Sequence, residues 1–244
     1  MKLLIQNELM KMKRLKMVYV ILVLSFLPYL INTGGMLTMS GEMDADKYYY
    51  FVFNQYAILF PTLVFIFAGF FFYTEFQNRT TLNWISYPYH NFSLVLSKIM
   101  AAFLLLLGTS LVNHFVHLLT LGALFQGEVG IEQLTANFLT SLFFSFLTIL
   151  IIPIAALLAF STRNILSVVI AGIGSIFVTT VLLGADFGII FPFSFIYRFS
   201  IQFFDASMGY GSQNLVLGGC LILTGYIIVS LIGLYKYSQK TRII

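Results

Sequence analysis

Six long runs of apolar residues constrain the fold of this chain more than any other feature of its sequence. They cover about residues 17–35, 51–73, 99–124, 136–160, 165–183 and 215–235. A helix needs roughly 20 predominantly apolar residues to cross a lipid bilayer. The chain is 59% apolar and only 9% charged, whereas an ordinary soluble domain is roughly 25% charged. This balance excludes the soluble globular and disordered classes.

The runs predict helices and not the strands of a membrane barrel. Only helices and closed barrels satisfy the backbone inside a membrane. A barrel strand has about 10 residues with alternating hydrophobicity, and these runs are longer and show no alternation. We therefore expect an all-α membrane protein with six transmembrane helices in one domain, residues 1–244.

A seventh apolar stretch, residues 187–204, is not counted as a span. It contains Pro192 and Arg198, and a charge at the bilayer centre costs at least ~2.5 kcal/mol. We interpret residues 186–212 as an extracellular re-entrant or interfacial helical region between the fifth and sixth spans.

The distribution of charge predicts which side each loop faces. With six spans, one side holds 11 of the 13 Lys and Arg residues and two acids, a net charge of +9. The other side holds two bases and seven acids, a net charge of −5. Because basic loops face the cytoplasm, both termini are expected to be cytoplasmic. The basic residues then report membrane topology, and we expect no nucleic-acid partner.

The first 16 residues are predicted to form an amphipathic elbow helix along the inner leaflet, with its bases toward membrane lipids. The apolar arc of this helix holds Met1, Leu4, Ile5, Leu9, Met12 and Leu15. Glu8 falls within the apolar arc and should require a basic partner. The alternative interpretation is a generic basic segment beside the membrane.

The longest cytoplasmic connection, residues 74–98, contains the single Trp of the chain. We expect a short helix at about residues 80–86 that ends before Pro88. Leu82, Trp84 and Ile85 could anchor this helix in a groove of another protein. The alternative is an ordinary connector whose Trp lies at the head-group level.

Several residues of this connection resemble the ABC-2 type permease family. The pattern comprises Glu75, Asn78, Thr80, Pro88 and the pair Ser97–Lys98, and the run at residues 7–14 is similar to the family's pre-span segment. Arg79 departs from the Gly that the family often has there. The resemblance implies that residues 74–98 form a coupling loop that contacts a nucleotide-binding subunit. The residues assigned to this contact are Glu75, Arg79, Thr80, Leu82, Trp84, Ile85 and Pro88.

The family resemblance implies the permease subunit of an ATP-binding-cassette exporter. No G-x-x-x-x-G-K-[ST] run is present, so the chain is expected to be no enzyme and to hold no cofactor, with ATP and Mg²⁺ on the partner subunit. The chain resembles small lantibiotic and bacteriocin-immunity permeases and phenol-soluble-modulin-type peptide exporters. This implies an amphipathic peptide substrate, a homodimer or sister permease, and a bacterial plasma membrane. An exporter of a lipid, drug or glycan, a secondary transporter or channel, and a membrane enzyme are the alternatives.

Three polar residues, Asn113, His114 and His117, lie midway along the third span and share one face of the helix. Such residues usually face a bundle interior or water. They could line a substrate path or dimer seam, or form interhelical hydrogen bonds without a transport role. A proton relay is a weaker alternative, and no metal site is expected because too few ligands are near.

Overall fold

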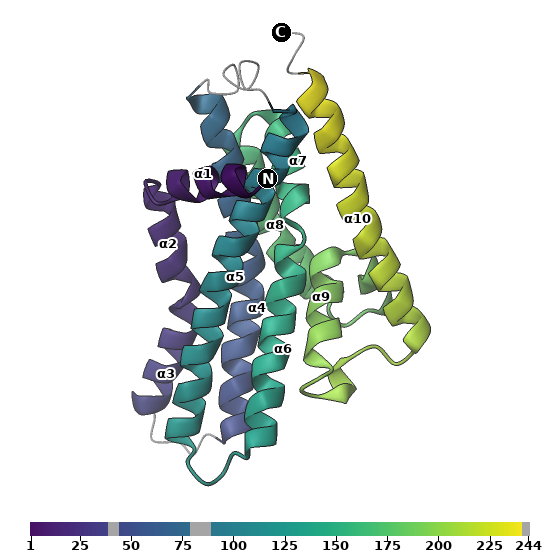
Figure 1. The fold of residues 1–244 in the computed structure, drawn as a ribbon. Helices are drawn as coiled ribbons and strands as arrows, with labels where there is room; N and C mark the ends of the chain where they lie inside the picture. The colour runs from purple at the N-terminus through teal and green to yellow at the C-terminus, as the bar shows by residue number, and fades with distance from the viewer. Residues whose placement is uncertain (39–43, 79–88, 241–244) are drawn as a thin grey trace.

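The computed structural model describes residues 1–38, 44–78 and 89–240, and the regular elements within these ranges are all helical. In chain order the α-helices are α1 (Lys2–Met12), α2 (Lys16–Ser25), α3 (Leu27–Thr38), α4 (Ala45–Gln77), α5 (Asn91–Leu124), α6 (Ile131–Ile149), α7 (Ile152–Thr162), α8 (Ile165–Leu182), α9 (Pro192–Ile201) and α10 (Gln213–Lys240). Two short 3-10 helices, η2 (Asp186–Ile190) and η3 (Ala206–Met208), flank α9. Figure 1 shows the helices as an elongated bundle with α1 lying across it.

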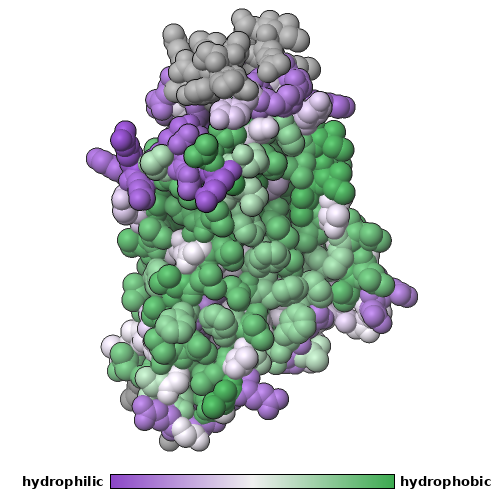
Figure 2. Space-filling model, viewed as in Figure 1, coloured by the Kyte–Doolittle hydropathy of each residue, from purple (hydrophilic) through white to green (hydrophobic). Residues whose placement is uncertain are grey.

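Six segments of the described chain are long and apolar enough to cross a membrane, which confirms the predicted all-α fold with six spans. Four of them are single helices, namely α4, α5, α8 and α10, whereas α2 with α3 and α6 with α7 form the other two. Figure 2 shows a broad hydrophobic band on the visible face, with hydrophilic residues gathered toward its ends. The protein is therefore a multi-pass membrane protein.

Helix α4 forms the centre of the bundle. Its most apolar window is 67% buried, against 17% for α8 and for α10. It packs against α2, α3, α5, α6, α7 and α8. Large aromatic side chains such as Phe60, Phe67 and Phe72 lie on α4 with almost no exposed surface. Burial of such side chains is energetically favoured because each contributes extensive packing contacts.

Two of the spans are broken where proline interrupts the helical hydrogen bonding. Pro28 lies in the first turn of α3, and α2 ends at Ser25. Pro153 occupies the first turn of α7, just after α6 ends at Ile149. Proline is tolerated at these positions because the backbone N–H it lacks has no partner in the first turn of a helix.

Helices α4 and α5 extend further than the apolar runs predicted. Helix α4 continues to Gln77 and α5 begins at Asn91, so both ends of the predicted loop at 74–98 are helical. The connector between these helices is reduced to residues 78–90. From the sequence these helical turns were assigned to a loop because they contain charged residues. In the structure those charges pair with each other inside the fold. The short helix expected at residues 80–86 falls outside the described residues.

The region between the fifth and sixth spans is built around Arg198 of α9. Its guanidinium donates to the carbonyl oxygens of Ala185 (3.2 Å) and Gly209 (2.7 Å), lies 3.6 Å from Asp186 Oδ1, and sits over the Tyr210 ring at 4.1 Å. With 10 residues, α9 reaches only about 15 Å at 1.5 Å per residue. It is too short to span, and its re-entrant or interfacial placement stays a prediction.

Candidate functional site

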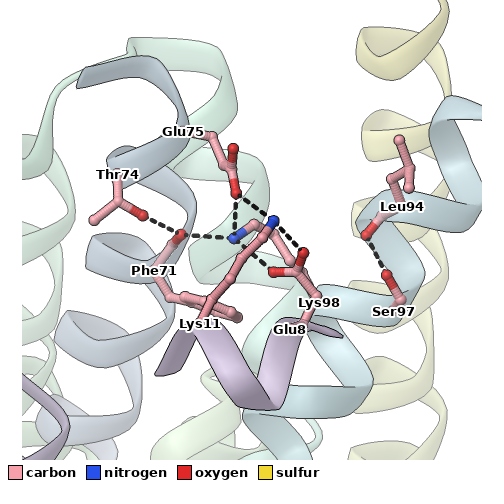
Figure 3. A network of polar contacts seen from close by, with 8 residues as sticks. All are labelled: Glu8, Lys11, Phe71, Thr74, Glu75, Leu94, Ser97 and Lys98. Carbon is pink, nitrogen blue, oxygen red and sulfur yellow. Dashed lines mark hydrogen bonds and ion pairs between the residues drawn. The ribbon is translucent and has the colours of Figure 1, made fainter. Parts of the chain in front are cut away.

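Four charged side chains meet where α1 crosses the adjoining ends of α4 and α5 (Figure 3). They are Glu8 and Lys11 of α1, Glu75 of α4 and Lys98 of α5, and we call them the charge network. Lys98 Nζ lies 3.0 Å from Glu8 Oε2 and 2.9 Å from Glu75 Oε1. Lys11 Nζ lies 2.6 Å from Glu8 Oε1 and 3.5 Å from Glu75 Oε1. One compact group of charges therefore joins three helices.

The ammonium group of Lys98 is the buried centre of the charge network. Its side chain is 1% exposed, and Nζ also donates to the carbonyl oxygen of Phe71 at 3.2 Å. The same Nζ lies 3.6 Å from the centroid of the Phe71 ring. Thr74 Oγ1 donates to that carbonyl as well, at 2.9 Å. These contacts replace the water that an ammonium loses on burial, which otherwise costs several kcal/mol.

The charge network is electrically balanced, with two carboxylates and two ammonium groups. The contact of Glu8 Oε2 with Lys98 is an ion pair and not a directed hydrogen bond. Burial acts to lower the pKa of Lys11, but its hydrogen bond and charge interaction with Glu8, and those with Glu75, raise that pKa above its ordinary value. Lys11 is therefore a cation at neutral pH.

The N-terminal sequence accounts for half of this arrangement. Glu8 and Lys11 are three residues apart, so they are neighbours on one face of α1. That face also buries Leu4 and Met12, which brings the Glu8 carboxylate into the fold. The prediction that Glu8 requires a basic partner is confirmed, and the structure supplies both Lys11 and Lys98. The sequence did not single out Lys98 as this partner because the two residues are 90 positions apart.

The residues predicted to contact a nucleotide-binding subunit fall mostly outside the described ranges. These are Arg79, Thr80, Leu82, Trp84, Ile85 and Pro88. Glu75 is described, and it lies buried in the charge network and not on an open surface. Two residues of the family-like pattern, Glu75 and Lys98, therefore contact each other directly. The coupling role of the loop at 74–98 stays a prediction.

Asn113, His114 and His117 of α5 are all buried in the middle of the bundle. Asn113 Nδ2 donates to the carbonyl oxygen of Ser25 at 2.7 Å, which ties α5 to α2. His114 Nε2 lies 2.7 Å from Ser145 Oγ of α6. Two of the three side chains thus form hydrogen bonds between helices.

The ring of His117 is packed among tyrosines. It stacks on Tyr49 with the centroids 5.8 Å apart, and it meets Tyr48 and Tyr29 edge-on at 5.5 and 6.0 Å. Among the described residues, His117 Nε2 and Asn137 Nδ2 have no hydrogen-bond partner. Both side chains line a cavity of about 10 Å³, which approaches the space of a single water.

The contacts of these polar residues favour a role in hydrogen bonding between helices, which is one of the roles that the sequence left open. Ser145 Oγ also donates to Tyr56 OH at 3.2 Å, and Tyr49 OH donates to the carbonyl of Asn137 at 3.0 Å. The contacts connect α4, α5 and α6 within one protomer. A role in a substrate path or dimer seam stays a prediction. Within residues 1–38, 44–78 and 89–240, no group of three His, Cys, Asp or Glu side chains is placed to hold a metal.

The tyrosines of α4 take part in these interhelical contacts, and the sequence analysis missed them. Tyr49 and Tyr56 lie seven residues apart, which places them two turns apart on the same face of α4. Both hydroxyls find partners on α6, namely Ser141 and Ser145. The spacing was readable in the sequence, but the partners depend on how α4 and α6 meet.

A comparison with protein-family models matches residues 4–178 to the family described as ABC-2 family transporter protein. The match covers more than two thirds of the chain and contains the whole charge network and the polar residues of α5. A comparison with curated proteins finds no match. The chain belongs to the ABC-2 family of transporter membrane proteins.

Proposed function

We propose that this chain is the membrane-spanning permease subunit of an ABC exporter, powered by a separate nucleotide-binding subunit. The proposed cargo is an amphipathic or antimicrobial peptide that leaves the membrane or the cytoplasm. Family membership supports the transport role. ATP and Mg²⁺ are assigned to the partner, because the sequence lacks the Gly-rich loop that cradles nucleotide phosphates.

The charge network is the observation that carries the coupling role. It holds together the two helices, α4 and α5, whose ends flank the connector at residues 78–90. Through Glu8 it also holds α1. Helix α4 contacts most of the bundle. A partner that moves the connector would therefore shift several helices together, as rigid-body transport motions require.

Two apolar cavities support an amphipathic cargo. One has a volume of about 380 Å³ and is lined by residues that include Phe65, Phe193 and Tyr226. The other has about 390 Å³ and lies beside Phe143 and Phe203. Cavities of this size suit apolar side chains or acyl chains, which peptides and lipids share. The substrate assay must therefore include both classes.

The proposed assembly contains two permease subunits, as a homodimer or with a sister chain, and two nucleotide-binding subunits. We place it in a bacterial plasma membrane with both termini in the cytoplasm. The acidic outer side, with a net charge of −5 from the sequence count, would attract a cationic peptide by electrostatic steering.

The test is co-purification of the permease with candidate nucleotide-binding subunits, followed by ATPase assays in nanodiscs. We expect an amphipathic peptide to stimulate ATP hydrolysis more than a lipid, drug or glycan does. Trp84→Ala should reduce both co-purification and stimulation. Phe187→Ala, which removes an exposed aromatic of η2, far along the chain from the connector, is the matched control and should change neither.

The outcomes separate the proposal from its alternatives. If no ATPase associates under any condition, the permease assignment is overturned. Stimulation by lipid alone keeps the exporter but replaces the peptide cargo. Transport that an uncoupler abolishes, without dependence on ATP, identifies a secondary transporter.

A further inference from the structure

The structure has a small amphipathic pocket between α1 and the first turns of α5. Its volume is about 110 Å³, and its lining includes Leu4, Asn7, Glu8 and Lys11 of α1 and Leu94 and Ser97 of α5. The α1 residues follow the i, i+3, i+4, i+7 spacing of one helix face. Since one water occupies about 30 Å³ of liquid, the pocket can hold several heavy atoms. We call it the headgroup pocket.

We propose that the headgroup pocket binds the phosphate of an anionic phospholipid, with Lys11 as its principal contact. The pocket combines apolar Leu4 and Leu94 with polar Asn7 and Lys11, and the Glu8 carboxylate in its lining is paired with Lys11 and Lys98. Such a mixture matches the junction between a lipid head group and its acyl chains. No catalytic step is involved.

The position of α1 supports a lipid ligand. Helix α1 immediately precedes the first span, which begins at Lys16. In Figure 2 the hydrophilic residues around α1 lie at the edge of the hydrophobic band. Met1, Leu3 and Met10 of the same segment are exposed. A helix with exposed apolar and basic residues at this level is suited to the membrane interface.

The charge around the pocket favours an anion. The first 17 residues contain five bases and one acid, a net charge of +4. Lys2, Lys13, Arg14 and Lys16 are exposed. Basic residues beside a membrane attract anionic lipids. A zwitterionic lipid would gain less from this net positive charge.

Lys11 can accept a phosphate without leaving a buried carboxylate unpaired. Its side chain is 52% exposed, and its contact with Glu75, at 3.5 Å, is the longest in the charge network. Glu75 keeps Lys98 at 2.9 Å. Because Lys11 belongs to both the pocket and the charge network, lipid binding would act on the contact between α1 and α4.

The test measures how much phosphatidylglycerol the purified permease retains from nanodiscs of mixed phosphatidylglycerol and phosphatidylcholine, read by native mass spectrometry. We expect Lys11→Gln to reduce the retained phosphatidylglycerol about ten-fold. Lys13→Gln removes the same charge outside the pocket and should lose at most about five-fold, the factor for ~1 kcal/mol per base near an anionic surface.

A second pair of variants changes no charge and avoids the charge network. Leu94→Trp fills the pocket and should also reduce retention about ten-fold. Leu104→Trp places the same side chain at an exposed position of α5 and should leave retention unchanged. If Lys11→Gln fails to fold, the comparison of Leu94→Trp with Leu104→Trp still tests the proposed lipid binding.

Two results would overturn the inference. Equal losses in Lys11→Gln and Lys13→Gln, with none in Leu94→Trp, would show diffuse attraction without a site. Inorganic phosphate that raises the unfolding temperature in phosphatidylcholine nanodiscs as much as phosphatidylglycerol does would identify free phosphate as the ligand. The measurement uses the permease alone, so its failure is distinct from failure of the proposed exporter function.

Discussion

At the residue scale, Lys98 joins α1, α4 and α5 through one buried ammonium group. We expect Lys98→Met to lower the free energy of unfolding by about 3–5 kcal/mol, because it leaves two carboxylates with less compensation. Removing one partner of a buried ion pair costs more free energy than the intact pair contributes, because the remaining charge stays buried without compensation. Reversible unfolding in detergent or lipid would measure the change.

The control for Lys98→Met is Lys47→Met, which breaks an exposed pair with Asp44. Exposed pairs contribute little, so this variant should unfold much like the wild type. Combining Lys98→Met with Glu75→Gln removes one charge of each sign. The double variant should be less destabilised than the two single effects added together. Strict additivity would contradict a coupled charge network.

The two histidines of α5 give a second residue-scale prediction. His114→Phe removes the hydrogen bond to Ser145 and should cost about 1–3 kcal/mol. His117→Phe keeps a ring between the tyrosines and removes an Nε2 that has no partner among the described residues. It should therefore be less destabilising than His114→Phe in unfolding measurements.

Transport assays on the same two variants separate a structural role from a path role. A folded His117→Phe protein that transports normally supports the interhelical interpretation. Selective loss of transport, with the unfolding temperature unchanged, would instead place His117 on a substrate path.

At the element scale, α10 packs closely on α9 at Gly219. A Cβ at this position would clash with Cε2 of Phe195, whose ring is fully buried. We expect Gly219→Ala to destabilise the protein by about 1–3 kcal/mol, the usual cost of overpacking. Thermal unfolding would measure it.

Gly225 provides the matched control on the same helix. A Cβ there meets no atom within 4 Å. Because alanine favours a helix over glycine by about 0.5–1 kcal/mol, Gly225→Ala should be neutral or stabilising. Destabilisation of both variants by the same amount would contradict a specific contact between α9 and α10.

The number of membrane spans could be predicted from the sequence far better than the ends of their helices. Hydropathy identified six spans because apolar length alone decides what can cross a bilayer. The same criterion ended the second span near residue 73, because a charged residue such as Glu75 is typical of a loop. The ion pair of Glu75 with Lys98 lets α4 continue to Gln77. Such pairings depend on tertiary contacts that no local pattern contains.

The candidate site was likewise only partly predictable from the sequence, because the partners of its residues depend on tertiary contacts. The position of Glu8 in an apolar arc predicted the need for a basic partner, and the i, i+3 spacing made Lys11 available. Lys98 could not be chosen, because many bases lie on the same predicted side of the membrane. The polar face of α5 could be predicted from the sequence, whereas its tyrosine neighbours on α4 could not.

At the scale of the whole molecule, the helix ends and loops lie at two opposite ends of the bundle, so the membrane topology can be tested by labelling. Helix α1, the end of α4 and the end of α10 lie at one end of the bundle, the upper end in Figure 1. The turn between α5 and α6, which includes Glu128, lies at the other end. Cys220 is the single cysteine, so Cys220→Ser provides a cysteine-free background.

We expect a membrane-impermeant maleimide to label Glu128→Cys in intact cells but not Lys2→Cys or Lys236→Cys. Permeabilised cells should show all three labelled. The expectation follows from the excess of Lys and Arg on the side of both termini, because basic loops stay in the cytoplasm. All three positions lie on described, exposed parts of the chain.

The pattern of labelling also tests residues 186–212. Three spans separate Glu128 from Lys236 if this region does not cross the membrane, and the two positions then face opposite sides. If it crossed, four spans would separate them and both would be labelled together. The reverse pattern, with Lys2 and Lys236 labelled and Glu128 protected, would keep six spans but invert the orientation. That result would place the charge network and the proposed ATPase contact on the wrong side of the membrane for cytoplasmic ATP.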